Sequence, residues 1–376
     1  MSARRPPIVG RYTAEEVELA TRNHGMPLEA LRYDVTPAGL HYLLVHFDIP
    51  PSDEGWSLGI GGLVERPFSL SLAELRSEDS LTVRATLECA GNGRGQISPR
   101  YPSVPWLEEG VSTAEWTGVP LARLLQRARL RDGVKEIVFH GADRGFDHGI
   151  EHDFARSLPL HEAMREEVLV AHAMNRAPLP PQHGAPLRLV VPRWYGMASV
   201  KWLRAIEAIE RPFDGFQQAV AYRFRRAQGE KGEPCSLMRV NSLMAPPGIV
   251  DFYTRRRIVN AGSVQMSGRA WSGAAPVERV EFAVDGEWTD AVVAKPEAPH
   301  AWQSWHTVWQ ARVGEHELAC RATDRGEMSS PWIRSGTCRD SVITRCRGSL
   351  SRCAADCAST RRPLERFSGR SALDRS

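Results

Sequence analysis

A change in residue pattern at about Asn241 restricts the fold of this chain more than any other feature of its sequence. Downstream of it, VERVEFAVDGEW (277–288) alternates Val280, Phe282 and Val284 with other residues and then reaches an Asp-Gly turn. Further runs of this kind are 257–273, 302–313 and 316–324. Several short alternating strands separated by turns predict a β-sandwich of ~100 residues.

The chain before this point has a less regular pattern. Short runs rich in β-branched residues, typical of strands, lie at 81–87, 135–140, 166–173 and 186–192. Two segments predict helices: 13–23, entered through a capping-box pattern of Thr13 and Glu16, and 120–130, whose leucines share one face. Because Pro and Gly divide many short elements without regular strand–helix alternation, the sequence predicts an α+β fold.

Length and charge limit the possible functions. At 376 residues the chain can form two domains, each with its own core. Its 48 basic and 45 acidic residues are too evenly balanced to indicate a nucleic-acid surface. No run approaches the ~18 apolar residues of a membrane span, and the Arg4-Arg5 pair lacks the apolar stretch of an export signal. We therefore expect a cytoplasmic protein that binds neither nucleic acid nor membrane.

We expect domains at 1–235 and 236–335, divided near the polar, Gly- and Pro-containing segment 225–236. The remaining residues, 336–376, are rich in Arg, Ser and Cys with few large apolar residues, and predict a disordered tail. Four of the seven cysteines lie in this tail, at irregular spacing and without histidines, which is weak support for a zinc site. The other three are too few for a disulfide framework.

Cys89 stands between an apolar run and a glycine-rich loop in TLECAGNGRG (86–95). A lone cysteine at a strand end is most often a small buried hydrophobe. The glycines would let the backbone approach a ligand closely, and Arg94 could lower the thiol pKa, which suits a nucleophile or a soft metal ligand. All three interpretations stay open, and no spacing selects a base among His140, His148, His152, His161, His172 and His183.

Two other groups of residues could carry chemistry. HGIEH (148–152) matches a zinc-protease string, with His148, Glu151 and His152 as its functional residues, but nearby glycines favour a surface loop over the helix that such a site needs. The second group is basic and stands beside Gly, Pro and aromatic residues, which suits either solvated surface or a pocket for a phosphate-bearing cofactor. It comprises Arg22, His24, His183, Arg188, Arg193 and Lys201.

Taken together, four stretches resemble the sulfite oxidase family of molybdenum enzymes. They are TRNHGMP (21–27), TLECAGN (86–92) with VPWLEEGVSTAEWTGVPL (104–121), the run 171–203, and MSGRAWSG (266–273). The resemblance spans roughly residues 15–332 and implies an α+β molybdopterin-binding domain followed by an immunoglobulin-like dimerisation domain.

The resemblance also implies residue roles. Cys89 would be the protein ligand of molybdenum, Arg22 would also meet the substrate oxyanion, and Trp106 would line the substrate pocket. The cofactor-binding residues would be Arg22, Asn23, His24, Cys89, Asp143, His183, Arg188, Ser199, Val200 and Lys201. Two positions near the substrate depart from the family: Phe154 replaces a tyrosine that hydrogen-bonds substrate, and Arg193 replaces a glycine.

The implied reaction is oxygen-atom transfer that oxidises sulfite to sulfate or acts on a related small anion. The same cofactor could serve an S-oxide or nitrate reductase, while a zinc hydrolase at 148–152 and an inactive scaffold are alternatives of other classes. No C-x-x-C-H haem motif is present, so electrons would pass to a cytochrome-like protein or to oxygen. The resemblance ends after Pro331-Trp332, where the family continues with a strand. We therefore expect a homodimer whose sandwich lacks an edge strand.

Overall fold

β-Sheet dominates the computed structural model, which describes residues 12–51, 55–96, 103–224, 230–326 and the backbone of 342–347. Helices are few and short in these ranges, so the balance of secondary structure differs from the expected α+β class. They are α1 (Ala14–Arg22), α2 (Leu72–Ser77), α3 (Leu121–Ala128) and α4 (Leu160–Ala163). Both predicted helices form, and Thr13 and Glu16 complete the capping box at the start of α1. None of the helices described is long and apolar enough to cross a membrane.

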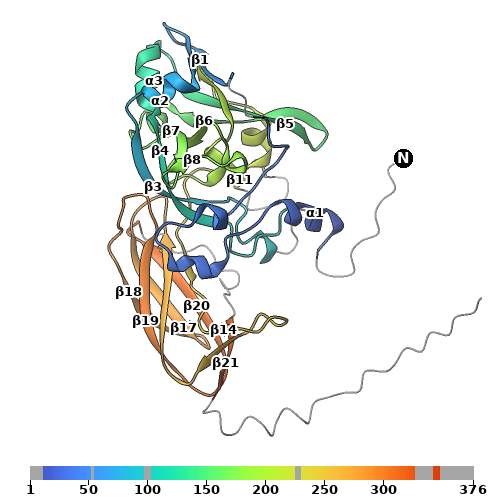
Figure 1. Ribbon diagram of the computed structural model, residues 1–376, viewed down its shortest axis with the longest axis vertical. Helices are drawn as coiled ribbons and strands as arrows, with labels where there is room; N and C mark the ends of the chain where they lie inside the picture. Colours follow the sequence, from blue (N-terminus) through green and yellow to red (C-terminus); the bar gives the residue numbers. More distant parts are fainter. Residues whose placement is uncertain (1–11, 52–54, 97–102, 225–229, 327–341, 348–376) are drawn as a thin grey trace, which may run out of the picture.

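Two sheets build the first part of the chain, shown in the upper half of Figure 1. The first has the order β2-β1-β10-β5-β6 and is antiparallel except where β1 pairs β10. Its strands are β1 (Ser57–Gly62), β2 (Phe68–Ser71), β5 (Glu136–Asp147), β6 (Ile150–Pro159) and β10 (Leu203–Ile209). The second is antiparallel, with the order β3-β4-β7-β8 and β9 also paired to β7. Its strands are β3 (Leu81–Glu88), β4 (Val111–Pro120), β7 (Leu169–Met174), β8 (Ala177–Pro178) and β9 (Arg188–Val190).

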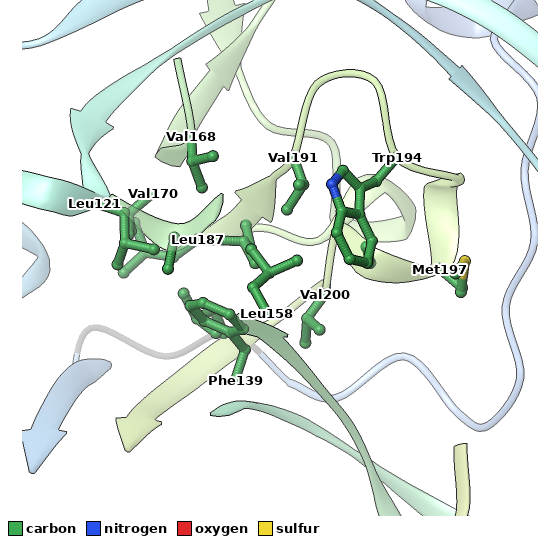
Figure 2. Packing of buried hydrophobic residues seen from close by; sticks show 14 of the residues in the cluster. Leu121, Phe139, Leu158, Val168, Val170, Leu187, Val191, Trp194, Met197 and Val200 are labelled. Carbon is green, nitrogen blue, oxygen red and sulfur yellow. The ribbon is translucent and has the colours of Figure 1, made fainter. Parts of the chain in front are cut away.

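One hydrophobic core joins elements of these two sheets. Figure 2 shows Phe139 of β5, Leu158 of β6 and Leu187 packed together, with Val200 beside them. α3 contributes Leu121, Leu124 and Leu125 to the same core, as expected from its leucine spacing. This packing fixes the strand ends that surround the site described below.

The second part of the chain forms a β-sandwich, drawn mainly in orange in the lower half of Figure 1. Nine strands follow the order β13-β16-β19-β18-β17-β20-β21-β15-β14, and β13 lies against β20 to close the core. Alternate residues such as Val280, Phe282, Leu318 and Cys320 point into that core. The strands are β13 (Asn241–Met244), β14 (Ile249–Val250), β15 (Arg257–Asn260), β16 (Gly262–Trp271), β17 (Val277–Val284), β18 (Glu287–Val293), β19 (Gln303–Ala311), β20 (Gly314–Asp324) and β21 (Val342–Arg347).

β21 corrects two expectations about the end of the chain. Residues 342–347 lie in the segment 336–376 that composition predicts to be disordered, yet they form a strand. β21 pairs antiparallel with β20 and parallel with β15, so the sandwich does contain a final strand, and it lies between two others. Residues 336–341 and 348–376 lie outside the described residues.

Polar contacts connect the sandwich to the first part of the chain. Arg269 of β16 is buried and donates through Nε to the carbonyl oxygen of Leu31 at 2.8 Å. The same guanidinium pairs with Asp34 at 2.8 Å and lies 5.7 Å from the ring of Trp302. Trp302 in turn donates through Nε1 to the carbonyl oxygen of Asp34 at 3.0 Å. Arg269 therefore ties β16 to the segment before the first sheet.

We predict that Arg269→Ala lowers the free energy of unfolding by about 2 kcal/mol, because it removes a charge-assisted bond to a carbonyl and the packing on Trp302. Urea denaturation followed by tryptophan fluorescence measures this loss. The control is Arg279→Ala, whose half-exposed side chain pairs with Asp290 and whose loss should cost less than about 1 kcal/mol. Equal losses in the two variants would contradict a connecting role for Arg269.

Candidate active site

A cavity at the ends of several strands brings together seven of the residues predicted from the sequence. It holds about 640 Å³ free of atoms, including its open mouth. The predicted residues that line it are Cys89, Asp143, Phe154, His183, Arg188, Ser199 and Lys201. Because they come from segments as far apart as β3 and β10, the fold, and not local sequence, assembles this site.

Cys89 follows the last residue of β3 and is buried in the cavity wall. Its backbone N–H donates to the carbonyl oxygen of Gly110 at 2.7 Å, which continues the β3–β4 pairing by one residue. Its Sγ accepts a hydrogen bond from the backbone N–H of Gly91 at 3.4 Å. Burial raises the pKa of the Cys89 thiol, and the positive charge of Arg94 acts in the opposite direction. The thiol is therefore protonated at pH 7 until a cation or metal stabilises the thiolate.

Asp143 enters the cavity from an irregularity in β5, where the pairing register shifts between His140 and Arg144. Such bulges redirect side chains beside functional sites. A Cβ at Gly141 would lie 2.5 Å from Oδ1 of Asp143 and 3.0 Å from the carbonyl oxygen of Lys201, so a larger residue there would displace the Asp143 side chain. The same Oδ1 is buried and has no hydrogen-bond partner among the described residues. Burial raises the pKa of Asp143, and nearby Lys201 opposes that rise.

Two basic side chains, the partly buried Lys201 and the buried Arg188, line the cavity together with Asp143. Lys201 donates through Nζ to the carbonyl oxygens of Leu44 at 2.7 Å and Gln182 at 3.3 Å. Burial and the neighbouring Arg188 lower the pKa of Lys201. Neither cation takes part in any ion pair that the structure records among its described residues. An anion in the cavity would therefore meet the charge of Arg188, which no carboxylate of the described residues pairs, and Lys201, whose nearby acidic group is Asp143.

Arg188 is held by backbone carbonyls and an aromatic ring. Its Nη1 and Nη2 donate to the carbonyl oxygens of His183 at 3.0 Å and Ser199 at 3.2 Å. The guanidinium carbon lies 4.6 Å from the centre of the Trp116 ring. Burial lowers the pKa of Arg188 to about 10, so the side chain stays charged at pH 7. Its position is fixed without a carboxylate, which leaves its charge available to a ligand.

His183 and His41 supply neutral polar groups beside these cations. Their rings meet edge to face, with centroids 5.2 Å apart. Burial, the other histidine and Arg188 keep the pKa of His183 well below its usual range, and burial lowers that of His41 to about 3. Nδ1 of His41 hydrogen-bonds the carbonyl oxygen of Tyr42 at 2.9 Å, while its buried Nε2 has no partner among the described residues. His41 therefore presents a hydrogen-bond acceptor to a ligand.

This set of donors fits a molybdopterin cofactor. The thiol of Cys89 is a soft metal ligand, and the cations Arg188 and Lys201 suit a phosphate-bearing group. The unpartnered atoms of Asp143 and His41 are acceptors for the N–H groups of a heterocycle. When bound, the cofactor would supply a metal capable of two-electron oxygen-atom transfer.

The segment 22–24 is not part of the cavity lining, and its role in cofactor binding stays a prediction. Arg22 is half exposed, bonds the carbonyl oxygen of Phe47 at 3.0 Å and pairs with Asp48 at 3.3 Å. His24 is exposed, and its backbone pairs with Leu43. Asn23 is buried, and its Oδ1 accepts from the backbone N–H of Val45 at 2.6 Å. Through these contacts the segment supports residues 43–45, two of which line the cavity.

Three further predicted residues also lie outside the cavity lining. Val200 belongs to the hydrophobic core of Figure 2. Arg193 has a positive φ of 74° and donates through Nε to the carbonyl oxygen of Gly273 at 2.8 Å, so it contacts the sandwich. Trp106 is buried, meets the ring of Tyr42 edge to face and packs in one apolar cluster with Cys89. The predicted contacts of these three residues with cofactor or substrate stay predictions.

HGIEH lies on a hairpin and not on a helix or in a long loop. His148 is in the turn between β5 and β6, and His152 is in β6, where its Nε2 hydrogen-bonds Gln217 at 2.9 Å. No group of three or more His, Cys, Asp or Glu side chains among the described residues could hold a metal ion. The placement of the string therefore gives the zinc-hydrolase alternative no support.

Sequence reasoning missed several residues that line the cavity. They are His41, Tyr42, Leu43, Leu44, His46, Met197 and Tyr222. A weak signal existed for His41 and His46, because both stand in the apolar run LHYLLVHF, where polar residues need a reason. The sequence offered no comparable signal for Tyr222. This residue lies within the overall span of the resemblance but in none of the four stretches that carry it.

Comparisons with known proteins show the family of the chain. Residues 46–217 match the family model described as "Oxidoreductase molybdopterin binding domain", a range that begins at His46. The chain is 30% identical over 344 residues to sulfite oxidase of Gallus gallus, covering 80% of this chain and 72% of that protein. It belongs to the sulfite oxidase family. As a member of this family, the protein is an oxidoreductase whose cofactor is molybdenum-bearing molybdopterin.

Other relatives place the protein within this broader family. It is 37% identical over 186 residues to the NADPH nitrate reductase of Beauveria bassiana, covering 47% of this chain and 20% of that protein. The chain spans about a fifth to a third of the fungal nitrate reductases it matches, 20% in one and 31% in another. The crystal structure of the sulfane dehydrogenase SoxCD from Paracoccus pantotrophus has a TM-score of 0.72 at 27% identity, covering 85% of this chain and 81% of that one.

A pH prediction follows from Glu88, the residue before Cys89. Burial raises the pKa of Glu88 to about 6, from 4.5 for the free side chain. A raised folded-state pKa means that the contribution of Glu88 to stability is fully present below pH 4.5 and is lost as pH rises through about 6.

We expect the free energy of unfolding of the wild type, relative to Glu88→Gln, to fall by roughly 2 kcal/mol between pH 4 and pH 7, because one pKa unit is worth about 1.4 kcal/mol. Urea denaturation of both proteins at these two pH values measures the change. A difference that stays constant or rises with pH would contradict the raised pKa.

Proposed function

We propose that the protein transfers an oxygen atom to or from a small sulfur or nitrogen oxyanion, with sulfite oxidation as its main reaction. In that reaction sulfite and water give sulfate, two protons and two electrons. The observation that carries this proposal is the position of Cys89 in one cavity with the basic side chains of Arg188 and Lys201. A thiolate ligand at one end and anion-binding charge at the other are what a molybdopterin and its substrate require.

The residues of the chain would share the work of holding and orienting. Cys89 would bind the metal, and its thiol proton would leave on binding. Arg188, already fixed by the carbonyl oxygens of His183 and Ser199, would bind the cofactor phosphate without further reorganisation. Asp143 and His41 would accept hydrogen bonds from the pterin. Phe154 would keep water away from one side of the cavity.

Phe154 cannot select among related substrates by hydrogen bonding, so other residues must make that selection. Its ring offers no hydrogen-bond donor to an anion, in contrast to the phenol expected from the family. Nitrate or an S-oxide as oxygen donor is the second candidate, and the matches to fungal nitrate reductases favour testing it. The two electrons would be exchanged with a separate acceptor or donor, such as a cytochrome-like protein or oxygen.

The sandwich would serve assembly. We propose an immunoglobulin-like arrangement for β13–β21 and a homodimer formed through it. The support is that the matches to sulfite oxidase and SoxCD cover 80% and 85% of this chain and so extend into the sandwich. We also propose a cytoplasmic location, because no run of the sequence approaches the ~18 apolar residues of a membrane span.

The proposal predicts that Cys89→Ser abolishes sulfite-dependent reduction of ferricyanide, by at least ~100-fold, because a serine hydroxyl is a poor ligand for a soft metal. The matched control is Cys320→Ser, a buried cysteine of the sandwich core, which should retain activity. Undiminished turnover in Cys89→Ser would contradict the assignment.

Elemental analysis of the purified protein separates the classes of function. Molybdenum with pterin in near-stoichiometric amount agrees with the proposal. Zinc without molybdenum would instead favour a hydrolase, and no metal would favour a scaffold.

A further inference from the structure

A histidine and a tyrosine form a hydrogen-bonded pair in the cavity wall. Nε2 of His46 lies 2.7 Å from the hydroxyl oxygen of Tyr222, and both side chains line the cavity. The His46 ring also contacts Phe154, with centroids 5.0 Å apart and planes inclined by 39°. His46 therefore lies between an aromatic ring without a polar group and a phenol.

Both members of the pair are neutral at pH 7. Burial, Lys201 and Arg94 lower the pKa of His46 to about 4, although Asp147 opposes them. Burial raises the pKa of Tyr222, whose phenol lines the same cavity as Cys89. When Nε2 of neutral His46 carries the proton, it donates to Tyr222, and the phenolic O–H is free to donate to a ligand.

The strongest donors elsewhere in the cavity are already engaged with backbone carbonyls. Lys201 donates to Leu44 and Gln182, and Arg188 donates to His183 and Ser199. Their charge attracts an anion, but their donors are partly occupied. A phenol held by a histidine adds a directional donor that no carbonyl competes for in the contacts among the described residues.

Arg156 fixes the segment that carries the phenol. Tyr222 follows η6 (Gln217–Ala221), a single π-helical turn. Nη1 of Arg156 donates to the carbonyl oxygen of Gln217 at 2.6 Å and Nη2 to that of Cys235 at 3.2 Å. The backbone N–H of Cys235 donates to the carbonyl oxygen of Tyr222 at 3.0 Å. A fully buried guanidinium thus fixes both chain segments around the phenol.

Arg156 and Phe154 stand two residues apart on β6, so their side chains leave the same face of the strand. Phe154 meets His46 on that face, and the guanidinium of Arg156 lies 5.8 Å from the centre of the Tyr222 ring. One strand face therefore positions both partners of the pair.

We propose that Tyr222 is the substrate-binding hydroxyl of this cavity: its phenolic O–H donates to an oxygen of the small anion bound near Cys89, with its acceptor lone pair held by His46. The inference rests on the proposed function, because it assigns the substrate contact within the same site. It predicts selectivity for anions that present an acceptor oxygen.

The test is Tyr222→Phe in the full chain loaded with molybdenum cofactor. A hydrogen bond to a charged group is worth about 1.5–3 kcal/mol, so kcat/KM for sulfite should fall roughly 10- to 100-fold. Molybdenum and pterin content should match the wild type. The control is Tyr195→Phe, which removes a buried phenol outside the cavity lining and should change kcat/KM less than about twofold.

A second readout does not depend on turnover. Sulfate binding measured by isothermal titration calorimetry should weaken about 10-fold or more in Tyr222→Phe. Failure of the wild type to oxidise sulfite or reduce nitrate would contradict the proposed function, while the sulfate measurement would still decide the role of Tyr222. Equal sulfate affinity in wild type and Tyr222→Phe, or no sulfate binding to the wild type, would overturn the inference.

Tyr42 is a second phenol in the cavity lining and provides the sharpest comparison. Its ring lies against His41 and Trp106, and the structure records no histidine bond to its hydroxyl among the described residues. A larger loss of sulfate affinity in Tyr42→Phe than in Tyr222→Phe would place the donor at Tyr42 and overturn the inference.

Discussion

The buried carboxylate of Glu88 is the contact on which the geometry of the site depends. It accepts hydrogen bonds from Asn92 at 3.1 Å, Asn241 at 3.3 Å and Nε1 of Trp271 at 3.0 Å. Asn92 closes the loop after Cys89 by accepting from the backbone N–H of Gly110 at 3.0 Å. The other two donors come from β13 and β16 of the sandwich. The loop that presents the cysteine is therefore held by the second part of the chain, and the sandwich contributes to the site as well as to any assembly.

Electrostatics explains why such firm support is needed. The cavity gathers Arg188 and Lys201 without an ion-paired carboxylate among the described residues, and burial of each charge costs free energy. Burial and the nearby charge of Arg188 lower the pKa values of His183 and His41, so both imidazoles are neutral. An anionic cofactor would offset this cost and so stabilise the folded protein, since a ligand that binds only the native state raises its stability. Until then, contacts such as those of Glu88 must hold the wall in place.

Patterns in the local sequence predicted those elements that depend on interactions between residues close together in the chain. The capping box at Thr13, the helix at 121–128 and most strands of the sandwich follow from spacing alone. Cys89, His183, Arg188, Ser199 and Lys201, which line the cavity, were predicted through a resemblance of ordered segments. β21 could not be found, because a strand with little hydrophobic pattern is fixed by long-range pairing with β20 and β15. The same limit hid Tyr222, which reaches the cavity through contacts with Arg156 and Cys235.

The position of the segment 22–24 outside the cavity lining affects the charge of the cavity wall. An arginine and a histidine beside a glycine look the same in sequence whether they line a cavity or, as here, support one from outside. Because Arg22 pairs with Asp48 at the surface, the wall instead presents Leu44 and the neutral His46. Positive charge near Cys89 then comes from Arg94, whose effect is seen in the lowered pKa of His46 and in its opposition to the raised pKa of Cys89. Without the charge of Arg22 in its wall, the pocket attracts anions less strongly over distance. Selection among anions must then depend more on directional hydrogen bonds at short range.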